Sequence, residues 1–144
     1  MQRSLNTVAQ LLALMQPFVD DEHLLKRSSK QLQDGLDEFI MIKRNDVIVG
    51  CVALKHYAEC QTGEIYALVV SKDYHNTGVS AELMILLLKK AKNLGLSTLF
   101  ALSKYGGHFF VRNGFEVVSV DDLPKHRQAS YDYQRSSTVY LKHC

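Results

Sequence analysis

The segment around Gly78 has the residue types and the spacing of an anion-binding loop. The apolar run 65–70 is typical of a strand, and the leucine-rich segment after Gly78 has the spacing of a helix. The first turn of a helix carries unpaired N–H groups and a partial positive charge, which together attract phosphate. Gly78 lets the backbone approach such a group closely. By itself, this pattern fits an ordinary turn glycine equally well.

A second distinctive segment lies nearer the C-terminus, at residues 106–115. Gly106-Gly107 open a short expected helix, 108–112, which Asn113-Gly114 end. Two consecutive phenylalanines lie inside it, and an expected strand follows at 115–120.

The elements around these segments predict a mixed α/β fold. One expected helix ends before Pro17, a second begins at the capping-box pair Ser28 and Gln31, and a third ends at Gly95. The order α α β β β α β α β β predicts a central sheet covered by helices, in a single domain over 1–144. The expected strands are 39–43, 47–54, 64–70, 98–102, 115–120 and 138–142.

The composition limits the class of protein. The 144 residues are 47% hydrophobic, and 17 basic against 15 acidic residues give a net charge of +2. One domain of this size needs no disulfide or metal for its core, and the balanced charge is not typical of nucleic-acid-binding proteins. The three cysteines are scattered, and no apolar run approaches the roughly 20 residues that span a bilayer. We therefore expect a soluble cytoplasmic protein without a metal, a nucleic-acid partner or a membrane partner.

Two segments together resemble the signatures of the GNAT acetyltransferases. His75-Asn76-Thr77-Gly78-Val79-Ser80 resembles the family's pyrophosphate loop, Arg/Gln-x-x-Gly-x-Gly/Ala, with His75 and Ser80 as departures. The segment 109–115, Phe-Phe-Val-Arg-Asn-Gly-Phe, resembles the family's aromatic-rich helix that ends in Gly-Phe. The resemblance implies the GNAT fold, with a mixed, mostly antiparallel sheet whose strands splay at an acetyl-CoA site.

The resemblance also implies which residues contact acetyl-CoA. The amides of 76–81 would hold the pyrophosphate, and a backbone N–H of 68–70 would hold the thioester carbonyl. Phe110 stands where many GNAT enzymes carry a tyrosine that protonates the leaving thiolate, and a phenyl ring cannot supply that proton. The expected acetyl-CoA contacts are Leu68, Val69, Val70, His75, Asn76, Thr77, Gly78, Val79, Ser80, Ala81 and Phe110.

A closer resemblance covers essentially the whole chain. The segments 24–28, 63–64, 123–124 and 131–137 look like the acetyltransferase domain of bacterial N-acetylglutamate synthase, and the run Tyr-Gln-Arg-Ser-Ser at 133–137 is the most specific of them. The commoner bacterial enzymes place an amino-acid-kinase domain ahead of this one, and nothing in the sequence corresponds to it. The chain is therefore compatible with a short stand-alone synthase or with an excised domain.

This closer resemblance implies roles for five residues. Arg27 and Arg135 would hold the carboxylates of L-glutamate, Ser137 would add a hydroxyl contact, Glu64 would be the general base and Ser103 the general acid. The chemistry agrees, because an α-amine is mostly protonated at neutral pH and has to lose a proton before it attacks. A thiolate leaves readily and needs only a weak proton donor.

Ordinary structural roles fit the same side chains. Glu64 also fits a strand-end surface carboxylate, the arginines fit surface ion pairs, and Ser103 fits a hydroxyl that caps a turn. His56 and Cys60 have metal-like spacing, but two ligands are too few for a metal site.

Three functions stay open at this point. The first is acetylation of L-glutamate, which would serve arginine biosynthesis. The second is acetylation of another amine, such as a different amino acid, a polyamine or a protein N-terminus, although paired arginines disfavour a polyamine. The third is a non-catalytic module that senses acyl-CoA or an amino acid, which the presence of Glu64 and Gly78 disfavours. The oligomeric state is open, a homo-oligomer included.

Overall fold

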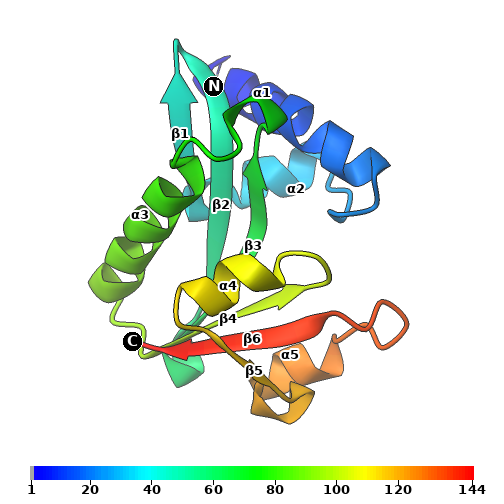
Figure 1. The fold of residues 1–144 in the computed structure, drawn as a ribbon, viewed down its shortest axis with the longest axis vertical. Coiled ribbons are helices and arrows are strands. Elements are labelled where there is room, and N and C mark those ends of the chain that lie inside the picture. Colours follow the sequence, from blue (N-terminus) through cyan, green and yellow to red (C-terminus); the bar gives the residue numbers. More distant parts are fainter. Residues whose placement is uncertain (1) are drawn as a thin grey trace. The chain divides into compact units, whose positions relative to one another are not determined.

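A computed structural model describes residues 2–144, which form two compact units (Figure 1). The first unit comprises the chain up to Ala53 together with 67–89, and the second comprises 54–66 together with 90–144. Over residues 2–144, six strands form one sheet in the order β1-β2-β3-β4-β6-β5. The expected mixed sheet with flanking helices is therefore confirmed.

The first unit joins two N-terminal helices to a hairpin. Strands β1 and β2 pair antiparallel, and Asn45 and Asp46 turn the chain between them with φ angles of 54° and 63°, as a tight hairpin requires. Its elements are α1 (Gln2–Asp20), α2 (Ser29–Asp34), η1 (Leu36–Glu38), β1 (Phe39–Arg44), the first part of β2 (Val47–Tyr57), the last part of β3 (Thr62–Val70), η3 (Lys72–Tyr74) and most of α3 (Val79–Asn93).

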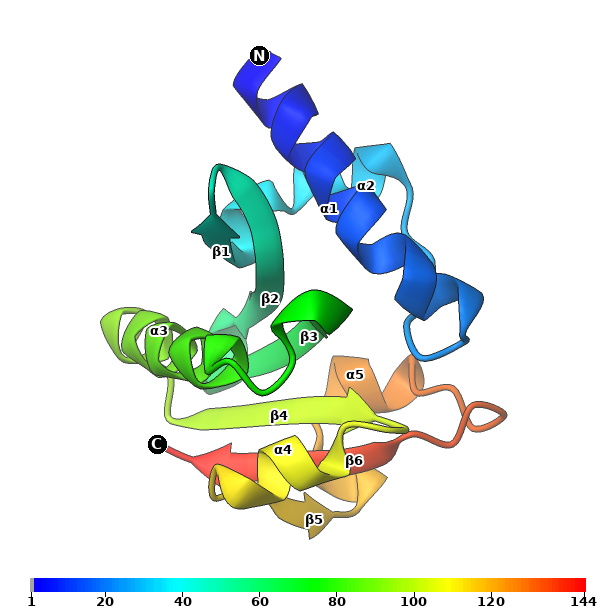
Figure 2. The same cartoon turned by 45° about the horizontal axis from the view of Figure 1, so that its top comes forward.

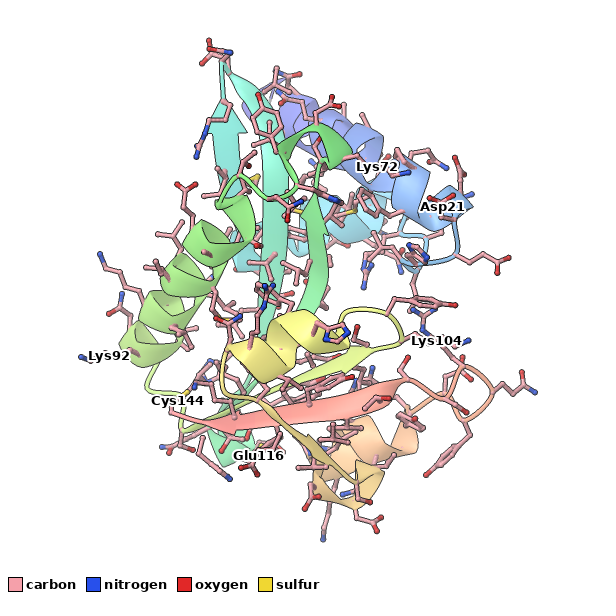
Figure 3. The ribbon with its side chains drawn as sticks, viewed as in Figure 1. Asp21, Lys72, Lys92, Lys104, Glu116 and Cys144 are labelled. Atoms are coloured by element: carbon pink, nitrogen blue, oxygen red, sulfur yellow. The ribbon has the colours of Figure 1, made fainter. Side chains whose placement is uncertain are left out.

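Helix α1 runs through Pro17 to Asp20, so the expectation that it ends before the proline is wrong. A proline inside a helix removes one backbone hydrogen bond. The last turn and the residue after it also contact the segment that follows β3, which favours the continued helix. The Phe18 ring lies 6.4 Å from the His75 ring, and Asp21 Oδ2 lies 3.3 Å from Lys72 Nζ. Figure 3 labels Asp21 and Lys72.

The second unit is built on β4 and β6. Strand β6 pairs antiparallel with both β4 and β5, and α4 lies against β6 (Figure 2). Val139 of β6 packs with Phe100 and Leu123, whereas Tyr140 packs against Phe110 of α4 on the opposite face. The elements are η2 (Ala58–Cys60), β4 (Thr98–Ser103), α4 (Gly107–Arg112), β5 (Glu116–Val118), η4 (Val120–Asp122), α5 (Lys125–Ala129) and β6 (Thr138–His143).

Strands β3 and β4 pair over only part of their lengths. The parallel pairing joins Thr62 to Thr98 and ends at Ile65 and Ala101, although β3 continues to Val70 and β4 to Ser103. This early end agrees with the splayed strands that the family resemblance implies. Among the helices of residues 2–144, none combines the length and the apolar character that crossing a bilayer requires.

Candidate functional site

The expected anion loop lies in the first unit, between β3 and α3. Asn76 and Gly78 have φ angles of 64° and 90°, and α3 begins at Val79. The Glu82 N–H donates to the Gly78 carbonyl at 3.0 Å, so the amides of 79–81 have no acceptor within the helix. A Cβ on Gly78 would meet nothing within 4 Å. The glycine is therefore required by its φ angle, and the open space beside it is compatible with a phosphate.

Two side chains fasten this loop to the backbone around it. His75 Nε2 lies 2.8 Å from the Val70 carbonyl oxygen. Because a carbonyl only accepts, His75 donates from Nε2 in this arrangement. The Thr77 hydroxyl donates to the Tyr74 carbonyl. The loop is thus fixed at the end of β3, where an anion would approach the start of α3.

Helix α3 packs closely on β2 in the first unit. A Cβ on Gly50 would lie 2.6 Å from Val79 Cγ1 and 3.2 Å from Leu83 Cδ1, so only a glycine allows this approach. Arg44 Nη2 pairs with Glu82 Oε2 at 2.6 Å. Because Glu82 belongs to the first turn of α3, this ion pair offsets a negative charge next to the unpaired amides.

A left-handed residue interrupts β3 just before the loop. Ala67 is buried with a φ angle of 52°, and Cys51 Sγ donates to its carbonyl at 3.3 Å. Burial raises the pKa of the Cys51 thiol from 9.0 to about 12, opposed by the charge of Arg27 and by the Val69 backbone. The thiol therefore keeps its proton and acts as a donor. The backbone of 68–70, which follows this irregularity, is where a donor to the thioester carbonyl is predicted.

Arg27 lies between α1 and α2 in the first unit and is half-buried. Its Nη1 donates to the Leu25 carbonyl at 3.1 Å. The next residue, Ser28, caps α2: Ser28 Oγ accepts from the Gln31 N–H at 3.1 Å, and Gln31 Oε1 accepts from the Ser28 N–H at 2.8 Å. The expected capping box is confirmed. The charge of Arg27 lowers the pKa of the Cys51 thiol, against the larger effect of burial.

Glu64 is buried on β3, in the second unit, so it is not an exposed strand-end carboxylate. The Tyr57 hydroxyl donates to Glu64 Oε1 at 2.8 Å, and Arg127 Nε donates to the same oxygen at 2.9 Å. The side chains of Arg127 and Glu64 are 21% and 11% exposed. Both hydrogen bonds that reach this carboxylate from the described residues end on Oε1, which leaves Oε2 available for a further proton or ligand.

Ser103 ends β4, directly opposite Thr138 of β6. Its Oγ accepts from the Gly106 N–H at 2.7 Å, so its own proton is available to another acceptor. A Cβ on Gly106 would lie 2.7 Å from that oxygen, and a Cβ on Gly107 would collide with the Tyr140 hydroxyl. The paired glycines therefore make room for two hydroxyl groups at the start of α4.

Phe110 is buried within an aromatic cluster of the second unit. Its ring is stacked on Tyr140 with the centroids 5.5 Å apart, and it meets Phe115 and Phe109 edge-on at 5.3 and 5.4 Å. These contacts give Phe110 a core role, and its contact with acetyl-CoA stays a prediction.

Arg135 and Ser137, both in the second unit, lie together. Arg135 Nε donates to Ser137 Oγ at 3.1 Å, and the Arg135 N–H donates to Asp132 Oδ1 at 3.1 Å. The Tyr131 hydroxyl donates to the Ser137 carbonyl at 2.6 Å. The two residues predicted to bind one substrate thus share a hydrogen bond, on a turn that leads into β6.

Sequence reasoning missed three side chains that contact or support these residues. Arg127 lies on α5, a five-residue helix without an apolar periodicity that would have predicted it. Cys51 occupies one position in a nearly continuous apolar strand. Tyr57 ends β2, and no local pattern predicts that its hydroxyl reaches Glu64. Among the described residues, no cluster of three or more histidine, cysteine or acidic side chains forms a metal site.

Two relatives with similar sequences are much longer than this chain. An amino-acid acetyltransferase of Edwardsiella ictaluri is 33% identical over 138 residues, which is 96% of this chain and 31% of that protein. The amino-acid acetyltransferase of Pseudomonas syringae pv. syringae is 33% identical over 141 residues, which is 98% of this chain and 33% of that protein. This chain therefore spans about a third of the length of these relatives.

Solved structures and a family model agree on the fold. The N-acetylglutamate synthase of Neisseria gonorrhoeae, solved with coenzyme A and N-acetyl-glutamate, superposes with a TM-score of 0.89 at 34% identity, over 94% of this chain and 32% of that one. A Mycobacterium tuberculosis protein solved with coenzyme A shares the fold at 22% identity, with a TM-score of 0.79 over 97% of this chain and 95% of that one. The model of the acetyltransferase (GNAT) family matches residues 5–115. With that match over most of its length, the chain belongs to the acetyltransferase (GNAT) family.

Proposed function

We propose that this chain is an amino-acid N-acetyltransferase that moves the acetyl group of acetyl-CoA to the α-amine of L-glutamate. The observation that carries the proposal is the buried carboxylate of Glu64, held at Oε1 with Oε2 available. It is supported by the 34% identity to a synthase solved with coenzyme A and N-acetyl-glutamate. Residues 1–144 are proposed to act as one acetyltransferase domain.

The chain's own residues supply the steps of a direct transfer. Glu64 takes a proton from the substrate ammonium, directly or through water, and the neutral amine then attacks the thioester carbonyl. A backbone N–H of 68–70 holds the carbonyl oxygen while it carries negative charge. The C–N bond forms and the C–S bond breaks. Ser103 donates a proton to the departing sulfur and regains one from the substrate nitrogen, directly or through water, as that nitrogen becomes the amide. The amides of 76–81 hold the pyrophosphate of acetyl-CoA.

Arginines give the proposed site its preference for an acidic substrate. Arg135, held by Ser137, and Arg27 each offer a planar guanidinium, which binds a carboxylate through two parallel hydrogen bonds. L-Glutamate presents two carboxylates and one amine. Glutamine replaces one carboxylate with a neutral amide, so one arginine loses its charged partner.

Acceptor selectivity tests this proposal. The kcat/KM for glutamate is expected to exceed that for glutamine by about ten- to a hundredfold, because a hydrogen bond to a charged group contributes roughly 1.5–3 kcal/mol. Aspartate, which also carries two carboxylates but on a shorter side chain, is compared as a further acceptor. Arg135→Ala should raise the KM for glutamate and leave acetyl-CoA binding unchanged, with the exposed Arg112→Ala as the control. Equal rates with glutamate and glutamine would contradict the proposed acceptor.

A further inference from the structure

We propose that Arg127 is a positioning residue for the carboxylate of Glu64. With the Tyr57 hydroxyl, its guanidinium holds Oε1 and so leaves Oε2 as the oxygen that takes the proton from the amine. The inference rests on the proposed function, since it assumes that Glu64 is the base.

The contact geometry is specific to an arginine. Arg127 Nε, not a terminal nitrogen, donates to Glu64 Oε1 at 2.9 Å, while Nη1 donates to Ser130 Oγ at 3.0 Å. The guanidinium thus spans two partners and is fixed in its plane. A lysine places its single ammonium one bond further along the side chain than Nε. Lysine therefore keeps the charge but loses both the position of the donor and the second partner.

The segment that carries Arg127 is itself firmly held. Gln128 Nε2 donates to the Asp121 carbonyl at 3.0 Å and to the Leu123 carbonyl at 2.7 Å. The Arg127 and Gln128 amides donate to the Pro124 carbonyl at 2.8 and 2.9 Å. Leu123 in turn is buried with Phe100 and Val139 between β4, β6 and η4. A short helix anchored in this way can hold a guanidinium in one place.

Tyr57 supports the same oxygen from a different element. Its ring lies 6.0 Å from the ring of Phe100, the residue that pairs with Glu64 across β3 and β4. The two donors therefore come from β2 and α5, which are far apart in sequence. Two donors from separate elements restrict the rotation of a carboxylate more than one donor does, and proton transfer depends on that orientation.

An ordinary structural ion pair is the competing explanation of this contact. An ion pair of this burial also ties α5 to β3, and removing one partner leaves a buried charge without compensation. If the pair is purely structural, breaking it lowers the stability of the protein. In a folded variant, the effect of the Arg127 substitution on kcat would then not depend on whether Glu64 is present. The test therefore needs kinetic coupling between the two residues in addition to a loss of activity.

The experiment compares Arg127→Ala, Arg127→Lys, Glu64→Gln and the Arg127→Ala/Glu64→Gln double variant, with the exposed Lys125→Ala of the same helix as the control. Arg127→Ala should lower kcat about 10- to 100-fold with little change in either KM, as expected when a catalytic group is displaced. Added guanidine, far below denaturing concentrations, should restore part of the rate. On the Glu64→Gln background, replacing Arg127 should not lower kcat any further, because Arg127 acts only through Glu64. Lys125→Ala should behave as the wild type.

Several outcomes would overturn the inference. A loss in Arg127→Ala that persists on the Glu64→Gln background, or that falls on the KM for glutamate, means that Arg127 does not act through Glu64. If Arg127→Ala does not fold, Arg127→Lys takes its place, and wild-type kcat in that variant rules out the proposed role. Wild-type activity in Glu64→Gln itself refutes the proposed base, which separates failure of the function from failure of this inference.

Discussion

Cys51 shows how one buried side chain supports an irregular strand. A left-handed backbone at a residue other than glycine costs about 1–2 kcal/mol. Ala67 adopts that conformation in β3, and the Cys51 thiol satisfies its carbonyl at 3.3 Å. The donor role requires the protonated thiol, and burial secures it by raising the pKa of Cys51 to about 12.

Stability above pH 9 should therefore depend on Cys51. The folded protein holds the proton up to about pH 12, whereas the unfolded chain releases it near 9.0. The unfolded state then binds fewer protons, so the free energy of unfolding falls as pH rises through this window, by up to about 1.4 kcal/mol per pH unit. Urea unfolding from pH 7 to 11 checks this. Cys51→Ala should be less stable at pH 7, and its free energy of unfolding should lack this decrease with pH. If the free energies of unfolding of the wild type and the variant fall in parallel, the prediction is wrong.

Helix α3 is bounded by two left-handed glycines with different expected roles. Gly78 precedes its first residue with a φ angle of 90°, and Gly95 follows its last turn with a φ angle of 72°. A Cβ at either position would meet nothing within 4 Å. Substitution at the two sites therefore imposes a similar backbone strain, but only Gly78 adjoins the amides predicted to hold pyrophosphate.

The pair Gly78→Ala and Gly95→Ala separates strain from binding. Both variants should lose about 1–2 kcal/mol of stability, because an L-residue is disfavoured at positive φ. Only Gly78→Ala should weaken acetyl-CoA binding, by about tenfold, since its strain and added methyl group displace the loop amides. Calorimetric titration with acetyl-CoA measures this. If the two variants bind acetyl-CoA with equal affinity, the prediction that its pyrophosphate binds at this loop is wrong.

Local sequence rules succeeded where the chain carries strong local signals. The Ser28 capping box and the end of the third helix at Gly95 were placed correctly because each depends on a few adjacent residues. The rules failed at α1, which continues through Pro17 to a last turn that Phe18 and Asp21 hold by long-range contacts, and at α5, which the sequence did not predict. That second failure hid Arg127, because its contact with Glu64 depends on the packing of a helix without periodicity.

For the whole molecule, the sequence predicted which strands exist better than how they end. The six strands follow from apolar runs and turns, and the mixed sheet follows from their order. The edge strand expected at 115–120 is only Glu116–Val118, since Val120 turns into η4. The end of the pairing at Ile65 depends on contacts across the sheet, which no local pattern encodes.

That incomplete pairing leaves part of β3 with amides whose hydrogens can exchange with solvent deuterium. Strand β3 lies between β2 and β4, and its residues 62–65 pair with β4. Leu68, Val69 and Val70 lie beyond the end of that pairing. Those of their amides that do not bond to β2 should exchange quickly in the isolated protein. Acetyl-CoA at a hundredfold excess over its Kd should slow them by up to about a hundredfold, with no comparable change at 62–65. Hydrogen–deuterium exchange read by NMR would show the cofactor acting, in effect, as the missing length of a neighbouring strand.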